Sequence, residues 1–359
     1  MSLPKVDSLT ACADFSKTVS PFIPQLSSFP QQLLQSWSNP QDLKEIYLST
    51  NPVISAFAVS LFLAPVFLVV SEINRNYSQV DRLWSLLPTF YNAHFVIYAH
   101  LLGLPTTRLD TLLAFSTLWS MRLTYNYWRR GGYSIGSEDY RWELLRQKIH
   151  PILFFILNVV FISLIQSVLL FSITLPTYIL LLTARITGDQ STTADLVFSR
   201  ALVCLVLFEW FADQQQWAFQ QARKQYNETK KAPPGFLAGD LERGFVVSGL
   251  WAWSRHPNFA AEQAIWTILY QWACYVTDTY VNYAAVGAFS YLLLFQASTW
   301  LTESISAGKY PQYKEYQQRV GRFLPRMSTA TKEEEEEEKE REKERARAKA
   351  ESKGKGKAE

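Results

Sequence analysis

Cysteine and histidine are scarce in this sequence, and their positions exclude two classes of site. The 359 residues include only three cysteines, at Cys12, Cys204 and Cys274. Disulfide frameworks and cysteine-rich metal sites need several cysteines at close, regular spacing, so neither is indicated. The histidines also lack the spacing of metal ligands, as the positions of His94, His100 and His150 show. We therefore expect no metal site.

Leader sequences, strong net charge and nucleotide-binding glycine patterns are also missing. The first fifty residues contain neither a basic start nor a long apolar stretch, so no cleaved signal peptide is predicted. The formal net charge is only +3, which indicates no nucleic-acid partner. Gly131 and Gly132 permit a tight turn but form no dinucleotide fingerprint, because no strand precedes them. A Rossmann domain is therefore not expected.

The tail from Lys332 to Glu359 lacks the residues that build a core. It contains 11 acidic and 10 basic residues and no aromatic or branched aliphatic side chain. Such a segment is expected to be disordered or a solvated helix. We therefore divide the chain into an N-terminal polar segment at 1–50, a membrane domain at 51–326 and a charged low-complexity tail at 327–359.

Long apolar stretches fill the region between the two polar segments. A bilayer core about 30 Å thick needs roughly 20 mostly apolar residues in a helix, because every backbone amide in lipid must be bonded internally. The aromatic content of 15% also suits the bilayer interface. The sequence predicts an all-α, polytopic transmembrane bundle of about seven helices, with six to eight open because Leu175-Pro176 breaks one long stretch. The predicted spans are 52–71, 83–102, 109–128, 152–171, 196–217, 260–276 and 283–301.

Basic residues in the connecting loops predict the orientation of this bundle. The loops 129–151 and 218–255 are rich in Lys and Arg, and such loops stay on the cytoplasmic side. The segments 103–108, 183–195 and 277–282 have at most one basic residue each and are predicted to be lumenal. Seven spans then place the N-terminus outside and the C-terminus in the cytoplasm.

Ionisable residues gather at the predicted cytoplasmic ends of the spans. Asp81 precedes the second span, Arg122 lies within the third, and Asp213 closes the fifth. Charged groups at membrane depth are costly, so this set predicts a polar, water-accessible cavity on one side of the bilayer. The alternative for each residue is a helix-end charge that reaches the headgroups.

The string Trp251-Ala-Trp-Ser-Arg-His-Pro-Asn-Phe-Ala-Ala-Glu262 is the most specific motif. Pro257 suits the first turn of a helix, and such an N-terminus favours an anion such as phosphate, with Arg255 and His256 just before it. Asn258 and Glu262 are four residues apart, so they share a helix face. Their amide and carboxylate suit a carboxamide such as that of nicotinamide. A capped interfacial helix is the other interpretation.

Several motifs, in order along the chain, resemble those of the DUF1295 family. This family is related to the C-terminal domain of steroid 5-alpha-reductases, within a superfamily that also holds isoprenylcysteine methyltransferases. The resemblance covers roughly residues 50–326. It rests on Val80-Asp-Arg-Leu-Trp-Ser85 with Pro88, Arg122-Leu-Thr-Tyr-Asn126, Gly131-Gly-Tyr133, Glu138-Asp-Tyr-Arg-Trp142, Glu209, Asp213, Ser254-Arg-His-Pro-Asn-Phe259, and Tyr310-Pro311 with Tyr313 and Tyr316.

This resemblance implies a membrane reductase of the endoplasmic reticulum that uses NADPH on a double bond conjugated to a carbonyl in a lipid or sterol-like substrate. In the related reductases an Asn-Phe-x-x-Glu pattern binds the nicotinamide end of the cofactor, and Asn258, Phe259 and Glu262 match it, while Asp213 matches an aspartate near the end of an earlier helix. Arg255 and His256 are cofactor-binding candidates from their place before the helix N-terminus. Arg122 is a further candidate, with Asp213 and the cofactor as rival partners. The sequence also departs from the family pattern, because Ala261 replaces a glycine. Thr302-Glu303 stands where the classical enzymes carry basic and histidine residues that hold the cofactor.

Reduction of an enone requires a proton donor at the carbonyl oxygen, where negative charge develops. The catalytic candidates are Asp81, Tyr91 and Tyr125. Tyr125 has an alternative role in an aromatic belt, and Asp81 has one as a helix cap. Two alternative functions also stay open: methyl transfer with S-adenosylmethionine, and non-catalytic lipid binding. Membrane methyltransferases share the Arg-His-Pro-aromatic string but usually have glycine where Ala260 and Ala261 stand.

Overall fold

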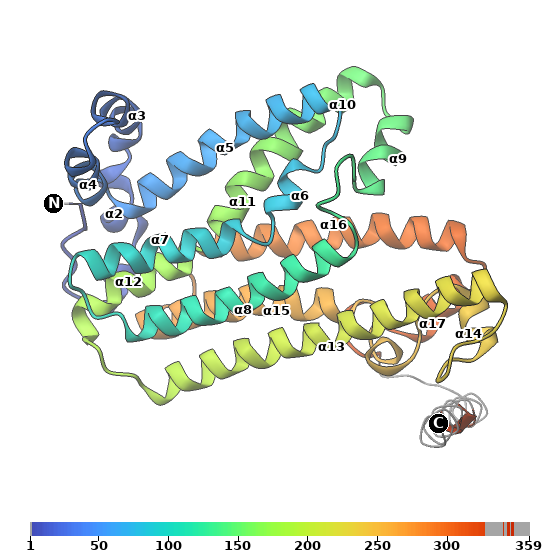
Figure 1. Ribbon diagram of the computed structural model, residues 1–359. Coiled ribbons are helices and arrows are strands. Elements are labelled where there is room, and N and C mark those ends of the chain that lie inside the picture. The colour runs from blue at the N-terminus through green and yellow to red at the C-terminus, as the bar shows by residue number, and fades with distance from the viewer. Residues whose placement is uncertain (1, 327–339, 341–342, 345, 348–359) are drawn as a thin grey trace. The chain divides into compact units, whose positions relative to one another are not determined.

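A computed structural model describes residues 2–326, 340, 343–344 and 346–347. Within these residues every regular element is a helix, and the one isolated bridge joins Ser254 to Gly321. The predicted all-helical class is therefore confirmed for this part of the chain (Figure 1). The tail predicted at 327–359 lies outside the described residues, apart from the five isolated positions.

Residue contacts divide the chain into two units. Unit 1 comprises 1–206 with 265–293, and unit 2 comprises 207–264 with 294–359. Within unit 1 lie α1 (Leu9–Cys12), α2 (Phe15–Thr18), η1 (Ser20–Phe22), α3 (Gln25–Ser36), α4 (Pro40–Ser49), α5 (Pro52–Asn74), α6 (Gln79–Leu83), α7 (Leu87–Leu101), α8 (Thr107–Arg129), α9 (Tyr140–Lys148), α10 (Pro151–Leu157), η2 (Asn158–Ile165), α11 (Gln166–Ser172) and α12 (Leu175–Thr187). Unit 2 holds α14 (Ala238–Arg243), η3 (Gly249–Ala252) and α17 (Tyr313–Arg319). Three helices contribute residues to both units: α13 (Thr193–Thr229), α15 (Pro257–Thr277) and α16 (Ala285–Lys309).

Proline marks the start of many of these helices. It occupies the first or second helical position where its missing N–H leaves no hydrogen bond unmade and its fixed φ favours the helix. Asn39 and Asn51 cap two of these starts by accepting hydrogen bonds from the backbone N–H of Gln41 and Val53, each at 3.0 Å. The prolines concerned are Pro40, Pro52, Pro88, Pro151, Pro176 and Pro257. The predicted break at Leu175-Pro176 is confirmed, because α12 begins there.

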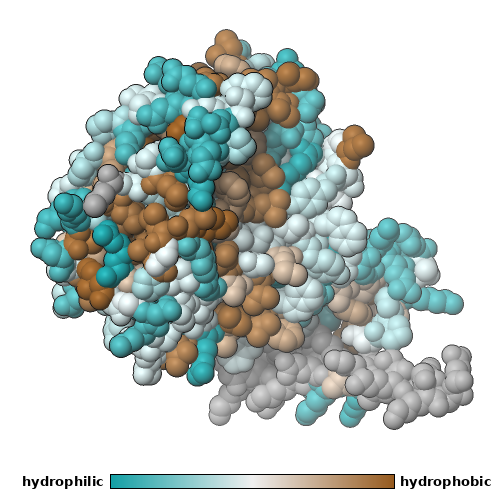
Figure 2. Space-filling model, turned by 60° about the vertical axis from the view of Figure 1, so that its left-hand side comes forward, coloured by the Kyte–Doolittle hydropathy of each residue, from teal (hydrophilic) through white to brown (hydrophobic). Residues whose placement is uncertain are grey.

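In the part of the chain that the structure describes, two helical stretches are long and apolar enough to cross a membrane: Pro52–Asn74 and Pro151–Thr187. They contain the first and fourth predicted spans. The other five predicted spans also fall on helices, namely α7, α8, α13, α15 and α16. These helices carry more polar residues, and the total of about seven spans stays a prediction. Figure 2 shows apolar and polar side chains interspersed on one face of the molecule.

The N-terminal fifty residues fold onto the helices of unit 1. The hydroxyl of Tyr178 in α12 donates to the carbonyl of Thr18 and accepts from Asn51 Nδ2, both at 2.9 Å. Tyr98 in α7 donates to the carbonyl of Thr50 at 3.2 Å. The segment predicted only to be polar contains helices, and buried tyrosine hydroxyls of α7 and α12 bind it.

Large aromatic side chains and one buried ion pair hold unit 1 together. Trp119 and Trp266 are almost fully buried, with their rings edge to face at 5.1 Å. Arg108 Nε binds Asp195 Oδ1 at 2.8 Å, and Trp272 Nε1 donates to the same oxygen at 2.9 Å. A buried ion pair is tolerated only when hydrogen bonds satisfy its remaining groups, as the indole does here.

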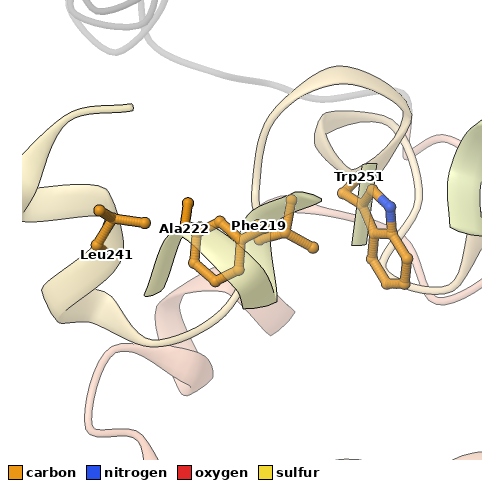
Figure 3. Close-up of a cluster of buried hydrophobic side chains, with 5 residues drawn as sticks. Phe219, Ala222, Leu241 and Trp251 are labelled. Carbon is orange, nitrogen blue, oxygen red and sulfur yellow. The ribbon is translucent and has the colours of Figure 1, made fainter. Parts of the chain in front are cut away.

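Unit 2 has its own small apolar core between α13, α14 and the segment before α15. Figure 3 shows Phe219 and Ala222 of α13 beside Leu241 of α14 and Trp251 of η3. The indole N–H of Trp251 donates to the carbonyl of Ala212 at 3.2 Å. This core holds Trp251, the first residue of the most specific motif, three residues before Ser254.

Candidate functional site

The first turn of α15 begins beside a returning segment of the C-terminal region. The backbone N–H of Arg255 donates to the carbonyl of Gly321 at 2.9 Å, and that of His256 donates to the carbonyl of Arg322 at 3.1 Å. Pro257 then starts the helix, as the sequence predicted. Residues 321–322 therefore hold the two residues that precede the helix.

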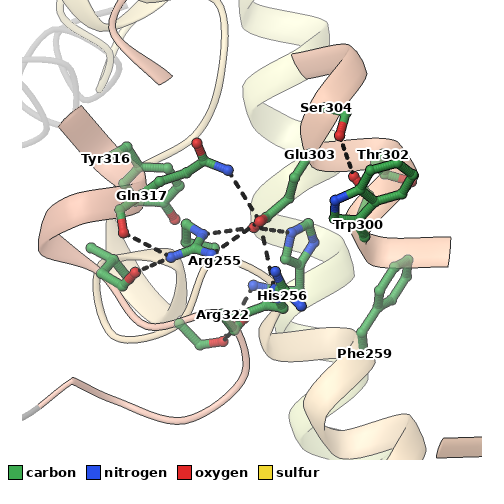
Figure 4. Close-up of polar contacts among 12 residues, drawn as sticks. Arg255, His256, Phe259, Trp300, Thr302, Glu303, Ser304, Tyr316, Gln317 and Arg322 are labelled. Atoms are coloured by element: carbon green, nitrogen blue, oxygen red, sulfur yellow. Dashed lines mark hydrogen bonds and ion pairs between the residues drawn. The ribbon is translucent and has the colours of Figure 1, made fainter. Parts of the chain in front are cut away.

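The carboxylate of Glu303, on α16, is the centre of a polar cluster in unit 2 (Figure 4). Arg255 binds it through Nε at 2.6 Å and Nη2 at 3.0 Å. His256 Nε2 lies 2.9 Å from its Oε1, and Gln317 Nε2 donates to its Oε2 at 3.1 Å. Arg322 Nε lies 3.6 Å away. We call Arg255, His256, Glu303, Gln317 and Arg322 the Glu303 cluster.

The Glu303 carboxylate is kept ionised by these neighbours. Only 3% of Glu303 is exposed, and burial alone would raise its pKa. The hydrogen bonds from His256 and Arg255, with the positive charge of both, outweigh burial and lower the pKa of Glu303 to about 2. Glu303 therefore supplies a permanent negative charge at the start of α15.

Arg255 has further partners besides Glu303. Its Nη1 group donates to the carbonyl of Gln317 at 3.0 Å and also to the carbonyl of Val320. A guanidinium with its donors committed in this way ties three chain segments together. Arg255 was predicted to bind a cofactor phosphate, and such a contact would have to replace one of these acceptors.

His256 and Phe259 lie ring on ring on the same side of α15. Their centroids are 5.4 Å apart with an interplanar angle of 18°, and Phe259 also meets Phe295 of α16 edge to face at 5.1 Å. The His256 ring is thus fixed by stacking on one side and by Glu303 at its Nε2 edge. His256 was predicted to hold a cofactor and here orders the helix start.

Two of the predicted cofactor residues meet directly. Asn258 Nδ2 on α15 donates to Asp213 Oδ1 on α13 at 3.1 Å, while Asn258 Oδ1 accepts from the backbone N–H of Phe259 at 3.0 Å. Glu262 lies one turn further along α15, and it is 5% exposed while Asp213 is 3% exposed. The predicted amide and carboxylates are therefore gathered on neighbouring helices in unit 2.

The predicted catalytic Asp81 lies in unit 1, at a contact between two of the recognised motifs. Its Oδ2 accepts from the indole N–H of Trp142 on α9 at 2.8 Å. Burial raises the pKa of Asp81, and the positive charge of Arg141 and the indole hydrogen bond lower it only in part. Asp81 thus joins the motif at 80–85 to the motif at 138–142.

Neighbouring polar contacts hold residues 137–138, just before α9, against the residues in and before α6. Tyr77 N–H donates to Glu138 Oε1 at 2.8 Å, and Arg82 Nη2 donates to the carbonyl of Ser137 at 2.7 Å. Gly132 packs closely against Tyr127 of α8, because a methyl group there would lie 2.4 Å from that ring. The motifs could be recognised in the sequence, whereas the contacts between them could not.

The other three predicted residues of unit 1 have different surroundings. Tyr91 on α7 is fully buried against Phe171, and its hydroxyl has no hydrogen-bond partner within the described part of the chain. Tyr125 on α8 is 43% exposed and lies below the guanidinium of Arg129 at 5.3 Å. Arg122, also on α8, is buried. Tyr91 thus has the environment of a buried polar group and Tyr125 that of a surface ring.

Sequence reasoning missed the roles of Glu303, Gln317 and Trp142. Glu303 was noted as a departure from the family pattern, whereas the structure makes it the partner of Arg255 and His256. The one signal in the sequence for this role was the position of Glu303, an acidic residue directly after the last apolar run. Among residues 2–326 and the five described tail positions, no group of three potential metal ligands is found.

Comparisons with known proteins agree with the motifs. The family model described as "Protein of unknown function (DUF1295)" matches residues 67–320. The chain is also 37% identical over 330 residues to "Uncharacterized protein C594.04c" of Schizosaccharomyces pombe, covering 91% of this chain and 94% of the relative. No solved structure matches. The predicted family resemblance is confirmed over most of the span expected for it.

Proposed function

Because the chain belongs to the DUF1295 family, we propose that it is an integral membrane oxidoreductase. The proposed reaction is the NADPH-dependent reduction of a carbon–carbon double bond conjugated to a carbonyl in a lipid or sterol-like molecule. The proposed location is the endoplasmic reticulum membrane, crossed about seven times, with the C-terminus in the cytoplasm. Membrane lipids and the lipid substrate are the expected partners.

The observation that carries this proposal is the arrangement of Asn258, Asp213 and Glu262. A primary carboxamide has two N–H donors and one carbonyl acceptor. Carboxylate oxygens can accept from its N–H groups, and a side-chain amide can donate to its carbonyl. The Asn258–Asp213 hydrogen bond supports this role, because it holds the Asn258 side chain in one orientation while Glu262 follows one turn later on α15. This donor set fits the neutral nicotinamide end of the cofactor.

Arg122 of unit 1 stays a proposed cofactor-binding residue on the ground of its motif alone. Within unit 2, the cationic groups proposed to face the phosphates are Arg255 and Arg322, with His256 beside them. Arg322 is the most accessible of them, with a side chain 37% exposed. NADPH, when bound, would supply the hydride. The cationic residues would orient it, and the stacked His256 and Phe259 would keep the helix start rigid.

Proton donation to the carbonyl oxygen is assigned to Asp81, Tyr91 or Tyr125. Asp81 is supported by its raised pKa and Tyr91 by its buried hydroxyl. A buried phenol without a partner costs free energy, and a substrate oxygen that accepted its proton would remove that cost.

Cofactor binding by the full chain in detergent tests the proposal. Isothermal titration with NADPH and with S-adenosylmethionine should give binding of NADPH alone. Asn258→Ala and Glu262→Gln should weaken that binding about tenfold or more, the loss of one or two charge-assisted hydrogen bonds. The matched controls Asn227→Ala and Glu228→Gln change exposed residues of α13 and should leave affinity unaltered.

Three outcomes would count against the assignment. Unchanged NADPH affinity in both site variants would remove Asn258 and Glu262 from the cofactor site. Binding of S-adenosylmethionine alone would establish methyl transfer instead, and binding of neither would favour a non-catalytic lipid-binding protein. Lipid extracts of cells without the protein should accumulate an unsaturated precursor.

A further inference from the structure

The short helix α3, in the N-terminal segment, presents an apolar stripe that the described residues of unit 1 leave exposed. Leu34 is 75% and Trp37 76% exposed, while Phe29 on the same helix is buried. Ile23 and Pro30 are exposed as well. In α3 and its C-cap Trp37, the spacing of 30, 34 and 37 places these three residues along one side of the helix, with 3.6 residues per turn, and Ile23 lies just before its start. Exposed glutamines such as Gln31 and Gln35 lie on another side.

Charge is absent from this whole region. Between Lys17 and Asp42 the sequence contains no Lys, Arg, Asp or Glu. Charged side chains are costly to bring into a bilayer, whereas Trp is enriched at its interface. Leu34 and Trp37 can therefore enter a lipid surface without drawing a charged side chain of α3 in with them.

The position of α3 along the fold agrees with that partner. The backbone N–H of Asn51, the residue that caps α5, donates to Gln25 Oε1 at the start of α3 at 2.8 Å. α3 and α4 pack against α5 near its first turns (Figure 1). α3 is thus fastened to the end of a helix that is long and apolar enough to cross a membrane.

The surface of α5 itself indicates where lipid would lie. Its exposed apolar residues are Phe62, Val66, Val69 and Ile73, separated by four, three and four positions. Its first residues, from Pro52 to Ala56, are buried under the N-terminal segment and neighbouring helices. The lipid-facing stripe therefore starts beyond the part of α5 that α3 and α4 cover.

We propose that α3 is an interfacial anchor that lies in the surface of the bilayer, with Leu34 and Trp37 inserted at the boundary between headgroups and acyl chains. The inference rests on the proposed crossing of the membrane by α5. It does not depend on the proposed reductase activity. The partner is the lipid surface itself, held by apolar contact and by the indole of Trp37.

Site-specific fluorescence in lipid nanodiscs tests this anchor. Single cysteines are introduced as Leu34→Cys, Trp37→Cys or Gln35→Cys in a Cys204→Ser background and labelled with an environment-sensitive dye. Cys204 is removed because it is exposed, whereas Cys12 and Cys274 are buried. Phe62→Cys serves as the reference for lipid contact within α5.

The labels at positions 34 and 37 should emit at shorter wavelength than the label at 35. Lipids with a nitroxide close to the headgroup should quench the two former severalfold more, and aqueous iodide should quench the label at 35 more. Two sites on the stripe keep the test valid if one variant does not fold.

The reference label at position 62 distinguishes a failure of the proposed membrane crossing by α5 from a failure of the proposed anchor α3. If the Phe62→Cys label is quenched by iodide and not by lipid nitroxides, the membrane proposal fails. If that label is in lipid while those at 34 and 37 behave like the one at 35, only the anchor is overturned. Labels at 34 and 37 that neither quencher reaches would indicate cover by another protein chain, which also overturns it.

Discussion

Glu303 accepts hydrogen bonds from side chains that lie 14, 47 and 48 residues away in the sequence. The local features around it follow simple rules. Pro257 starts a helix, and residues four apart share a face, so the helix start and the Asn258–Glu262 register could be predicted. Contacts with a carboxylate on another helix depend on tertiary packing, which no local pattern in Thr302-Glu303 encodes. The residues of α15 could thus be predicted from the sequence, whereas the contacts with Glu303 that hold the start of this helix could not.

At the same scale we predict the effect of Glu303→Gln. The change removes the negative charge that Arg255 and His256 face in a buried cluster, so the free energy of unfolding should fall by about 3 kcal/mol. Urea unfolding in detergent micelles measures the loss. Glu315→Gln on α17, which alters an exposed carboxylate, should change stability by less than about 0.5 kcal/mol.

The stability loss caused by Glu303→Gln should depend on pH. The folded pKa of Glu303 is about 2 and the ordinary value is 4.5, so its stabilisation is fully present above pH about 4.5 and is lost as the pH falls towards about 2. The stability difference between the original chain and Glu303→Gln should therefore narrow across that window. A difference that stays constant down to pH about 2 would show that the charge of Glu303 contributes nothing.

At the scale of elements, the bounds of the first predicted span were closer to the structure than those of the fifth. The first span was expected at 52–71 and α5 begins at Pro52, because an asparagine cap and a proline specify that point. The fifth span was expected at 196–217, whereas α13 continues to Thr229. Apolar length sets how much of a helix can lie in lipid, and the polar continuation of α13 carries good helix formers that need no lipid.

Close helix packing in α16 gives a second prediction. A methyl group at Gly287 would lie 2.2 Å from the backbone oxygen of Ser172, so Gly287→Ala should destabilise unit 1 by about 1–3 kcal/mol or more. Gly308→Ala on the same helix meets no atom within 4 Å and should be neutral or stabilise by about 0.5 kcal/mol. Thermal unfolding monitored by circular dichroism compares the pair, and equal effects would contradict the packing argument.

For the whole molecule, the orientation predicted from loop charge can be tested directly. Ile135 and Gln190 are exposed residues in loops expected on the cytoplasmic and lumenal sides. In a Cys204→Ser background, a membrane-impermeant maleimide should label Ile135→Cys in sealed cytoplasmic-side-out vesicles. Gln190→Cys should react only after permeabilisation. Labelling of both before permeabilisation would mean that the chain from Pro151 to Thr187 returns to the side from which it started.

The distance in sequence between Arg255 and its acceptors has a consequence for biosynthesis. The carbonyls that Arg255 and His256 need belong to Gln317, Val320, Gly321 and Arg322. A ribosome-bound nascent chain cannot complete the start of α15 until those residues have been translated and have left the exit tunnel, although every other part of the motif is already made. A premature stop codon shortly before Gln317 would therefore leave a protein with all its apolar helices but with Arg255 and His256 lacking these acceptors. Such a protein should be degraded by quality control rather than persist in a shortened form.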